Sequence, residues 1–579
     1  SNQLTPVQGK LYINGTDMVE NSYRLKSVTA YVSQSSIEFP DLTVYENLLY
    51  QAHLTIGNLK TEDISRRIDE TLEKLSLTSI KHVKAGTTVD HRISDFQRIC
   101  LRIAIEMIRN PYILFLDEPL SGLSFSDTKR LLSILKEETQ KGKLVILTSQ
   151  LPTSEIYNMF DKIWLIDSDG YMIYNGPPGG SLGFFRNTGL LPYCYIQSKT
   201  ELVSAEDVVK IVETKKIQTD GTVSEERQVA PGTWYDAWRA ESEGEFEKED
   251  SEIKPIPVYS SGLPGIEKQF LVYLIRNFRI KWKNLRFLIY NFLGVPLAGV
   301  LIALVTRLTI DDQYIFSENS FLPLFLFLGV NLILLTSMFM GSEEIFNEKN
   351  QVKRDLSFNL SHFSYQNAKI LYIFIISFIQ SLLFTYFTNL ILEIHEQTIR
   401  FLLVYFSVAA SGNLIALSLS ESIKKLNSIF IIIPFFIIPN LLFAGYLIPF
   451  NQEGLSKNFE DPVPVIAEFT PTRWAFEALV VEQYKNNPYN RYFFNEEKKL
   501  YQSNYLLNNL LPFLTEELNK SQYFKYIEPD PDSLDKSLSI ISEEFSYLPE
   551  NENIAPFENL ARLNSESFDT TLYDEAFGY

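Results

Sequence analysis

The sequence predicts an α/β domain, then an all-α domain that crosses a membrane, and then an acidic external segment of helical or irregular structure. Three observations support this order. Short apolar segments alternate with helical patterns over residues 1–190, five apolar runs without a charged residue fill most of residues 287–450, and acidic residues outnumber basic ones in residues 451–579. Alternating strands and helices are typical of a largely parallel, covered sheet. Charge-free runs of about 20 residues are long enough to cross a bilayer as helices.

The composition excludes several classes of protein. The 579 residues carry a net charge of -19, which argues against a protein that binds nucleic acid. Cys100 and Cys194 lie far apart, and the five histidines are scattered along the chain. Neither a disulfide framework nor a zinc site is therefore predicted.

Local signals define the elements of the first domain. Apolar segments bounded by turns predict strands at 11–14, 28–32, 113–116, 144–148 and 162–167. Amphipathic patterns predict helices at 44–54, 61–76, 97–110, 126–141 and 154–160. Thr43 and Thr61 stand where two of these helices begin, so each is predicted to cap a helix with its hydroxyl group.

The run ILFLDEP, residues 113–119, is the most informative stretch of the chain. Four apolar residues lead into Asp117 and Glu118, and Pro119 ends the strand. A buried parallel strand with this pattern delivers two carboxylates to the rim of the sheet. Asp117 can hold Mg²⁺ through water, and Glu118 can polarise a water for attack on a phosphate. A core strand that simply ends in two solvated acids is the alternative, and the motif alone does not decide between them.

Two segments are expected to join the first domain to the membrane. Residues 191–262 form a mixed, polar extension whose stretch 241–256 is strongly acidic and is predicted to be a mobile linker; an ordered surface loop is the alternative. Residues 263–286 carry basic side chains between aromatic and aliphatic ones, which predicts a basic amphipathic helix at the membrane surface.

Five transmembrane helices are predicted, and the loops between them predict the orientation. The apolar runs are 287–306, 321–340, 370–392, 401–420 and 426–450. Basic residues gather between the second and third runs and between the fourth and fifth, and basic loops stay in the cytoplasm. We therefore expect the first domain to be cytoplasmic and residues after about 451 to be external. Glu343 and Glu344, at the cytoplasmic end of the second run, are expected to meet the basic helix or to be solvated.

Polar residues inside the apolar runs are candidates for a substrate path. Asn331 lies in the second run, and Pro434, Pro439 and Asn440 lie in the fifth. Proline can kink a membrane helix, and asparagine can line a cavity, although hydrogen bonds between helices explain the same residues. In the external segment, Arg473 and Trp474 are expected to have a structural role.

Further motifs surround the Asp-Glu strand in a fixed order. They are YVSQ, ISDFQR, SGLS, ILTSQLP and MIYNGPP. This order resembles the nucleotide-binding domain of an ABC transporter, of the G-type branch that includes the white and pleiotropic-drug-resistance relatives. The later stretches SEEIFNEKNQVKRDLSFNLS and TPTRWAFEALVVEQYKNN look similar to bacterial members of that branch, so the resemblance extends to about residue 490.

The resemblance implies a partial P-loop ABC ATPase, with ATP and Mg²⁺ as cofactors and a second half-transporter as the partner. Gln34 then matches the glutamine that senses Mg²⁺ and contacts the membrane domain. Asp117 and Glu118 match the metal-binding aspartate and the general base, and Gln150 takes the place of the switch histidine.

Three further positions follow from the same resemblance. Ser94 and Gln97 match the ends of the signature sequence that grips the γ-phosphate of ATP on the opposite subunit. Ser124 takes a loop position that is often aspartate in the wider family.

The sequence departs from the family pattern in four respects. No G-x-x-x-x-G-K-[ST] loop occurs, although phosphates need its backbone N–H groups and its lysine. Asp95 and Phe96 replace two glycines, so we expect Asp95 to repel phosphate and Phe96 to block its approach. Gln150 cannot carry the charge of a histidine. Five apolar runs stand where the family has six spans, so the sequence is expected to be a fragment that is incomplete at both ends.

Two functions remain open. The first is a subunit of an ATP-driven exporter in a bacterial inner membrane, active as a dimer, with a lipid-like or amphipathic cargo. The second is an impaired pseudo-ATPase that regulates or scaffolds a membrane partner, which Asp95, Phe96 and Gln150 favour. ATPase activity rests on the resemblance alone.

Overall fold

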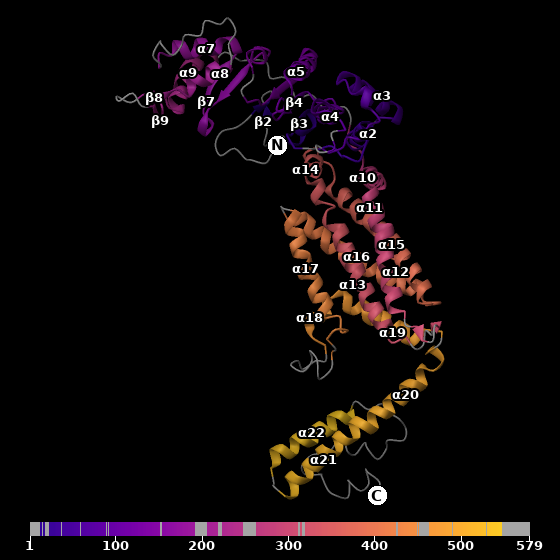
Figure 1. Ribbon diagram of the computed structural model, residues 1–579. Coiled ribbons are helices and arrows are strands. Elements are labelled where there is room, and N and C mark those ends of the chain that lie inside the picture. The colour runs from indigo at the N-terminus through magenta and orange to yellow at the C-terminus, as the bar shows by residue number, and fades with distance from the viewer. Residues whose placement is uncertain are drawn as a thin grey trace.

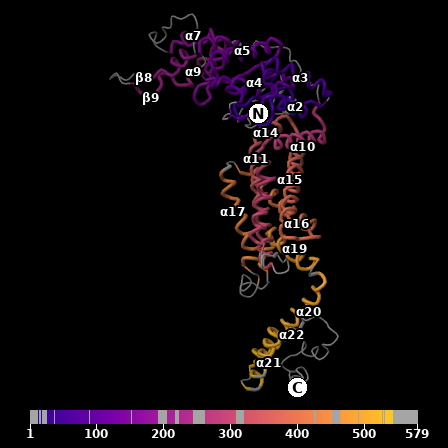
Figure 2. Tube along the Cα trace, turned by 45° about the vertical axis from the view of Figure 1, so that its right-hand side comes forward, coloured from indigo at the N-terminus to yellow at the C-terminus, as the bar shows by residue number. Residues whose placement is uncertain are grey.

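The computed structural model arranges the chain along one axis, with an α/β domain at one end, a helical bundle in the middle and a helical arm at the other end (Figure 1; Figure 2). It describes residues 12–13, 16–17, 22–35, 37–57, 59–87, 90, 92–150, 153–190, 205–217, 223–246, 262–307, 309–310, 313–314, 319–423, 426–448, 450, 463–488, 490–527 and 530–546. The end of the chain drawn in indigo belongs to the α/β domain, and the yellow arm lies beyond the bundle.

A three-stranded parallel sheet forms the centre of the α/β domain. Its strands are β3 (Thr29–Val32), β4 (Ile113–Leu116) and β5 (Leu144–Leu147), in the order β3-β4-β5. Val32 pairs with Leu116, and Leu116 pairs with Leu147, so all three strands end at the same edge. The parallel sheet expected from the alternating pattern is confirmed here. β6 (Ile163–Ile166) departs from it, because it forms an antiparallel hairpin with β7 (Met172–Gly176).

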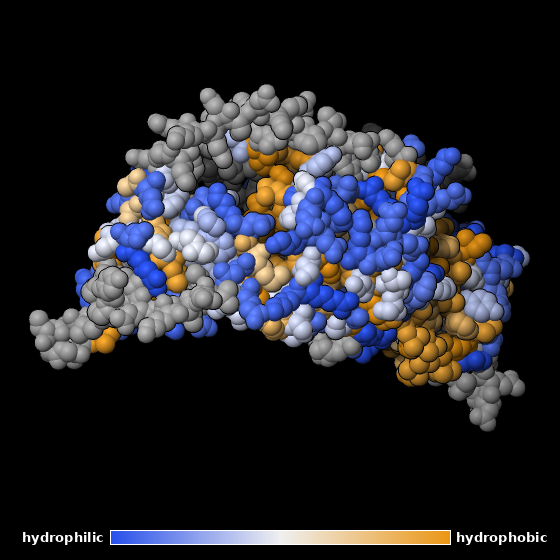
Figure 3. Space-filling view, turned by 90° about the horizontal axis from the view of Figure 1, so that it is seen from above, coloured by the Kyte–Doolittle hydropathy of each residue, from blue (hydrophilic) through white to orange (hydrophobic). Residues whose placement is uncertain are grey.

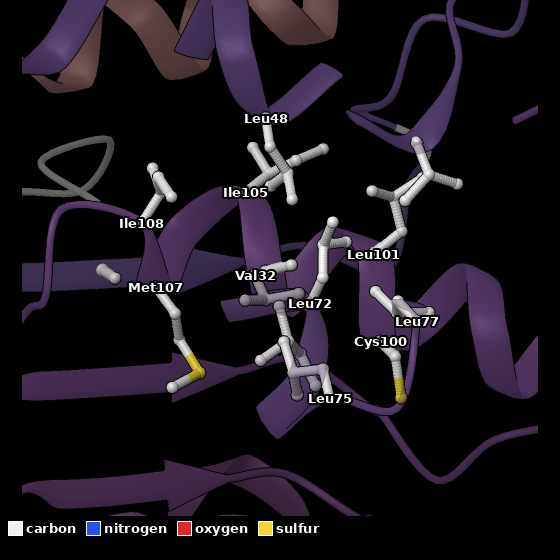
Figure 4. Close-up of a cluster of buried hydrophobic side chains, with 14 of the residues drawn as sticks. Val32, Leu48, Leu72, Leu75, Leu77, Cys100, Leu101, Ile105, Met107 and Ile108 are labelled. Atoms are coloured by element: carbon white, nitrogen blue, oxygen red, sulfur yellow. The ribbon is translucent and has the colours of Figure 1, made fainter. Parts of the chain in front are cut away.

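Helices α2 (Val44–Thr55), α3 (Thr61–Lys74) and α4 (Asp95–Met107) enclose the apolar core beside this sheet. Figure 4 shows side chains from all three helices meeting there, including the buried Leu48, Leu72, Leu101 and Cys100. The helix α5 (Phe125–Gln140) adds Leu131 and Leu135 to the same core.

The start of α2 agrees with the predicted cap, and the start of α3 does not. Thr43 accepts a hydrogen bond from the N–H of Glu46, and Glu46 in turn accepts one from the N–H of Thr43, which makes a complete capping box. At α3 the cap position belongs to Lys60, which makes no capping hydrogen bond with its side chain, and Thr61 is already the first helical residue. The prediction that Thr61 caps this helix is therefore wrong.

A second, smaller core follows the sheet. Trp234 is fully buried and packs edge-on against Phe185 at 5.0 Å between ring centroids. The remaining elements of this part are α6 (Ser154–Tyr157), α7 (Pro178–Asn187), α8 (Ala205–Val212), β8 (Lys215–Ile217), β9 (Val223–Arg227) and α9 (Pro231–Phe246).

Helix α9 occupies the first six residues of the stretch 241–256, which was expected to be a mobile linker. Residues 247–256 of that stretch lie outside the described residues. Two short elements precede the sheet, a hairpin of β1 (Tyr12–Ile13) and β2 (Thr16–Asp17) and the helix α1 (Ser22–Val28).

Four helical segments within the described part of the chain are long and apolar enough to cross a membrane: Leu285–Thr306, Leu322–Ser357, His362–Ile391 and Thr398–Ser422. They contain α11 (Leu285–Ile289), α12 (Val295–Thr306), α13 (Leu322–Ser342), α14 (Lys349–Ser357), α15 (His362–Ile391) and α16 (Thr398–Ser422). The fifth predicted span forms a shorter helix, α17 (Leu426–Leu442), which contains Pro434 and Pro439.

The segment after residue 451, which is expected to be external, contains further helices. They are α18 (Val465–Glu468), α19 (Pro471–Asn486), α20 (Phe494–Tyr505), α21 (Leu511–Tyr526) and α22 (Pro531–Ser546). Helix α19 packs on α13, α16 and α17, and the hydroxyl of Thr472 donates to Asn440 at the end of α17. Arg473 forms ion pairs with Glu468 and Glu477 and lies over the ring of Trp474, 4.3 Å from its centroid. Asn440 is thus engaged in a contact between helices, and Arg473 and Trp474 hold α18 and α19 together.

The predicted basic helix forms and joins the two domains. Helix α10 (Ile266–Trp282) packs against α2 of the α/β domain and α15 of the bundle. Arg279 and Lys283 both bind Glu46 on α2, while Arg276 is almost fully buried with its guanidinium 4.5 Å from the ring centroid of Phe39. The polar face of the helix thus meets the α/β domain, while apolar side chains such as Leu271, Ile275 and Trp282 remain exposed. Its position at a membrane surface stays a prediction.

A buried cluster of charges ties α10 to the bundle. The ammonium group of Lys369 lies 3.0 Å from Glu344 and 2.9 Å from Glu348, and Lys281 of α10 binds the other oxygen of Glu344. The expected meeting of Glu344 with the basic helix is confirmed, and Glu343 is exposed. Because two cations face two carboxylates, each buried charge is compensated.

Replacing Lys369 with methionine should therefore destabilise the bundle strongly. The change leaves Glu344 and Glu348 short of a positive charge in a buried place, which costs about 3–5 kcal/mol. The unfolding temperature in detergent measures the effect. Lys499→Met is the matched control, because the pair of Lys499 with Glu496 is largely exposed and is worth less than about 1 kcal/mol. Equal shifts for the two variants would contradict a stabilising role for the buried cluster.

Glu106, near the end of α4, is another buried acid, but unlike Glu344 and Glu348 it makes no hydrogen bond with its carboxylate among the described residues. Its side chain is fully buried. Burial raises the pKa of Glu106 from its usual 4.5 to about 7, although Arg109 and Arg354 act in the opposite direction. Arg354 belongs to α14, so this acid lies where the α/β domain meets the bundle.

The raised pKa gives stability a defined dependence on pH. Between about pH 4.5 and 7 the folded protein binds the proton of Glu106 more strongly than the unfolded chain does, so stability falls as the pH rises through this window and then levels off. Glu106→Gln should remove this part of the profile. Unfolding temperatures of both proteins measured from pH 5 to 8 test this, and parallel profiles would contradict an ionisable, buried Glu106.

Candidate functional site

A cleft lies at the edge where the three parallel strands end. It holds about 170 Å³ and is lined by residues of the loops after β3 and β4 and by the first turns of α4, among them Gln34, Asp95, Arg102, Asp117 and Glu118. Ligands bind at the carboxyl ends of strands in open α/β sheets, so this is the expected place for a site. The predicted delivery of Asp117 and Glu118 to the rim of the sheet is observed.

Two hydroxyl groups hold the carboxylate of Asp117. The hydroxyl of Tyr31 on β3 donates to Oδ2 at 2.9 Å, and the hydroxyl of Thr148, directly after β5, donates to Oδ1 at 3.1 Å. The backbone N–H of Asp117 donates to Val32 at 2.9 Å, which continues the strand pairing up to the site. The carboxylate is therefore fixed from both neighbouring strands. The hydrogen bond to Asp117, added to burial, raises the pKa of the Tyr31 hydroxyl.

Glu118 lies between two amide side chains. Nε2 of Gln150 donates to Oε1 at 2.6 Å, and Nε2 of Gln34 donates to Oε2 at 3.4 Å. The backbone of Glu118 has a φ of 46°, in the left-handed region that residues other than glycine seldom adopt. Such strain is found where a functional side chain has to be aimed. The structure thus brings three sequence-predicted residues, Gln34, Glu118 and Gln150, to one carboxylate.

Ser94 and Gln97 form the start of α4. The hydroxyl of Ser94 accepts a hydrogen bond from the N–H of Gln97, and Oε1 of Gln97 accepts one from the N–H of Ser94. This capping box satisfies two of the N–H groups at the helix start. Both side chains are at the end of the helix that adjoins the cleft, and each is engaged in capping.

Asp95 and Phe96, which replace glycines of the family pattern, point in different directions. Asp95 is exposed and lines the cleft, so the expected negative charge is present there. Phe96 is only 6 % exposed and packs into the core, with the guanidinium of Arg130 5.1 Å from its ring centroid. The expectation that Phe96 blocks the approach of a phosphate is therefore wrong, because its ring points away from the surface.

Ser124 begins α5. Its hydroxyl accepts a hydrogen bond from the N–H of Asp127 at 3.2 Å and lies 2.6 Å from Oδ2 of the same residue. Ser124 is exposed and is not among the residues that line the cleft. Its side chain therefore caps a helix next to the site.

A cluster of buried ion pairs adjoins the cleft and fixes one of its loops. Glu38 accepts from Arg98 at 3.1 Å and from Arg102 at 3.2 Å, and Arg102 also donates to the backbone oxygen of Gln34 at 2.8 Å. Burial would raise the pKa of Glu38, but the two guanidinium groups hold it below its usual value. This cluster fixes the loop that carries Gln34 against α4.

Sequence reasoning missed four residues that shape the site: Tyr31, Glu38, Arg102 and Thr148. Tyr31 and Thr148 stand within the quoted motifs YVSQ and ILTSQLP, but nothing local shows that their hydroxyl groups converge on Asp117. That convergence follows from the register of β3 and β5 on the two sides of β4. Glu38 and Arg102 are 64 positions apart, and no spacing rule links them.

The donors present suit a magnesium ion that is shared with a phosphate. Within the described residues no group of three or more histidine, cysteine, aspartate or glutamate side chains is placed to hold a metal. Mg²⁺, however, commonly uses one or two carboxylates together with substrate phosphates and water. Asp117, held at both oxygens and open to the cleft, fits that role, and no histidine or cysteine lines the cleft.

Comparison with known protein families gives two matches. Residues 1–121 match the ABC transporter family, and residues 268–484 match the ABC-2 type transporter family. The first match contains the cleft residues from Gln34 to Glu118, and the second contains α12 to α17 and most of α19.

Known proteins are similar over about a third of the chain. The Protein scarlet of Drosophila melanogaster is 34% identical over 192 residues, which are 33% of this chain and 28% of that protein. The ABC transporter G family member 38 of Arabidopsis thaliana is 33% identical over 30% of this chain and 12% of its own length. The broad substrate specificity ATP-binding cassette transporter ABCG2 of Rattus norvegicus is 33% identical over 32% of this chain and 27% of its own length. The chain thus spans less than a third of the length of each of these relatives.

Restoring a small residue at position 96 should harm the domain. Phe96→Ala removes a buried ring, which costs about 3–5 kcal/mol of stability. Asp95→Gly, one residue away, is the control; it removes an exposed charge from a helix start and costs about 1 kcal/mol or less. The unfolding temperature of the α/β domain in the intact protein tests both. A neutral Phe96→Ala would contradict the buried position of the ring.

Proposed function

We propose that this chain, which carries an ABC transporter ATPase domain followed by an ABC-2 type membrane domain and is homologous to ABC transporters of the G family, is one half of an ATP-driven exporter. The observation that carries the proposal is the position of Glu118. It stands in strained backbone at the end of a buried strand, between two amides. The cleft beside it is lined in part by α4, which packs on α2, and α2 in turn contacts α10 and α14.

Each cleft residue has a role in ATP hydrolysis under this proposal. Glu118 orients a water and accepts its proton, since a carboxylate aimed into a cleft can act as a general base. Gln34 and Gln150 hold the two carboxylate oxygens, so they fix the direction of the lone pairs. Asp117 and Gln34 would hold Mg²⁺, and the ion would supply charge that stabilises the phosphoryl group during transfer.

The site needs a second subunit. The cleft of about 170 Å³ is smaller than the roughly 300–1,000 Å³ of pockets that enclose a small molecule. Ser94 and Gln97 begin a helix whose N-terminal N–H groups carry partial positive charge, which favours an anion. We assign them to the γ-phosphate of ATP on a partner half-transporter, with Ser124 in the loop next to that interface. The partner is either a second copy or a related chain.

Closure of the two halves would reach the membrane through the joint between the domains. Glu46 of α2 binds both Arg279 and Lys283 at the end of α10, and Nη2 of Arg354 on α14 donates to Gln51 of α2 at 2.8 Å. Burial would raise the pKa of Glu46, but its hydrogen bonds with Lys283, Thr43 and Arg279 lower it to about 2, so it stays charged at physiological pH. A rigid contact of this kind transmits a displacement of α2 to the bundle.

The distribution of basic loop residues supports an orientation with the α/β domain in the cytoplasm and residues after about 451 outside. The resemblance to bacterial members of the G-type branch favours a bacterial inner membrane. Figure 3 supports an aqueous position for the α/β end, whose surface is largely hydrophilic with smaller apolar patches. Export and a lipid-like or amphipathic cargo follow from the family resemblance. One relative is named for broad substrate specificity, which agrees with transport but names no cargo for this chain.

The second candidate is a membrane scaffold that hydrolyses no ATP. Two features favour it: Asp95 adds negative charge to the cleft, and Gln150 stands where the family pattern has a histidine. Phe96 does not support the scaffold, because its ring is buried and does not line the cleft.

ATP turnover separates the two candidates. The protein expressed from its complete gene, in lipid nanodiscs, should hydrolyse ATP only with Mg²⁺, and Glu118→Gln should lower the rate by about 10²–10⁴-fold, because it removes the general base. The glutamine keeps the shape of the side chain, so a change in folding is not expected. Equal, background rates for the two proteins would reject the exporter and support the scaffold.

A further inference from the structure

We propose that Thr148 is a positioning residue for hydrolysis, because its single hydroxyl group joins the metal-binding carboxylate of Asp117 to the backbone of the general base Glu118. The inference rests on the function proposed above and adds to it a residue outside the predicted set. It depends on three hydrogen bonds that meet at the end of β5.

The hydroxyl group of Thr148 accepts one hydrogen bond and donates another. Oγ1 of Thr148 accepts from the backbone N–H of Glu118 at 2.9 Å and donates to Oδ1 of Asp117 at 3.1 Å. A hydroxyl group has one proton to donate and two lone pairs, so both bonds form at once. The backbone N–H of Thr148 donates to Leu116 at 3.0 Å, which fixes the residue in register with the strand that carries both acids.

The bond to the backbone of Glu118 has a particular consequence. Glu118 has a φ of 46°, which costs on the order of 1–3 kcal/mol for a residue with a Cβ and persists only where the surroundings hold it. The hydroxyl of Thr148 holds the N–H of the strained residue directly. Without it, the backbone can relax, and the carboxylate then moves away from Gln34 and Gln150, which hold its two oxygens.

We expect Thr148 to fix the position of Glu118 and to contribute little to the stability of the fold. Thr148 is exposed, so water can replace its hydrogen bonds when the side chain is changed. The folded protein therefore loses little stability. Turnover, in contrast, depends on the direction of Glu118, and a displacement of about 1 Å can lower a rate by about 10²-fold.

Tyr31 provides a comparison within the same site. Its hydroxyl binds Oδ2 of Asp117 at 2.9 Å and has no hydrogen bond with Glu118. Removal of this hydroxyl group tests the fixation of the metal-binding carboxylate alone. Removal of the hydroxyl group of Thr148 tests the link between the two acids.

The experiment compares Thr148→Val, Thr148→Ser and Tyr31→Phe with the wild type and with Glu118→Gln, all as complete protein in nanodiscs. Valine keeps the shape of threonine without the hydroxyl group, and serine keeps the hydroxyl group. We expect Thr148→Val to lower kcat by about 10–100-fold with a KM for ATP within about threefold of the wild type, because positioning of the base acts on the chemical step. Thr148→Ser should retain most of the rate, Tyr31→Phe should lose less than Thr148→Val, and all unfolding temperatures should agree closely.

The outcomes are distinct. A wild-type rate above that of Glu118→Gln, together with a fully active Thr148→Val, overturns the role of Thr148 and leaves the exporter in place. Equal losses for valine and serine, or for Thr148→Val and Tyr31→Phe, also overturn it, since the hydroxyl link to Glu118 would then not matter. A wild-type rate equal to that of Glu118→Gln overturns the proposed function itself, and the role of Thr148 with it.

Discussion

Charges that are buried between the two domains have to be paired, and this constraint determines how the α/β domain and the helical bundle meet. Lys281 and Lys369 face Glu344 and Glu348 inside the bundle, and Arg276 and Arg354 are buried close to Asp355. An unpaired charge at such a place costs several kcal/mol. Helices α10, α14 and α15 can therefore move only as a unit, because separating them would expose or unpair these groups. The same unit binds Glu46 and Gln51 on α2.

The cleft is connected to this unit through α2 and α4. The first turns of α4 line the cleft, and its last turns bring Glu106 and Arg109 close to α14, where Arg109 lies over the ring of Phe358. At the cleft end, Glu38 joins Arg98 and Arg102 to the loop that carries Gln34. A change in the loop of Gln34 thus reaches the bundle through one packed helix.

The sequence predicted what depends on local pattern. The run ILFLDEP placed Asp117 and Glu118 correctly, and Thr43 was correctly predicted to cap α2, because a strand end and a helix cap are local events. The direction of Phe96 was not predictable, since it depends on the phase of α4 against a core assembled from distant segments. The hydrogen-bond partners of Tyr31, Glu38 and Thr148 were not predictable, because they depend on strand register and on residues far away in the sequence. Tyr31 and Glu38 bind side chains 60 or more positions away, and Thr148 binds groups 30 or more positions away. The contact of the basic helix with Glu46 was not predicted, because an amphipathic pattern does not identify what covers the polar face of a helix.

We propose that the chain forms a dimer in which ATP bound in the cleft moves the far end of the bundle. Spin labels at Phe469→Cys, an exposed position beyond α18, would report it most directly in the Glu118→Gln protein, which should bind ATP without turning it over. The distance between the two labels of a dimer, measured by pulsed electron paramagnetic resonance, should change when Mg²⁺ and ATP are added. If no distance between two labels can be measured, or if the distance is the same with and without ATP, the account is contradicted.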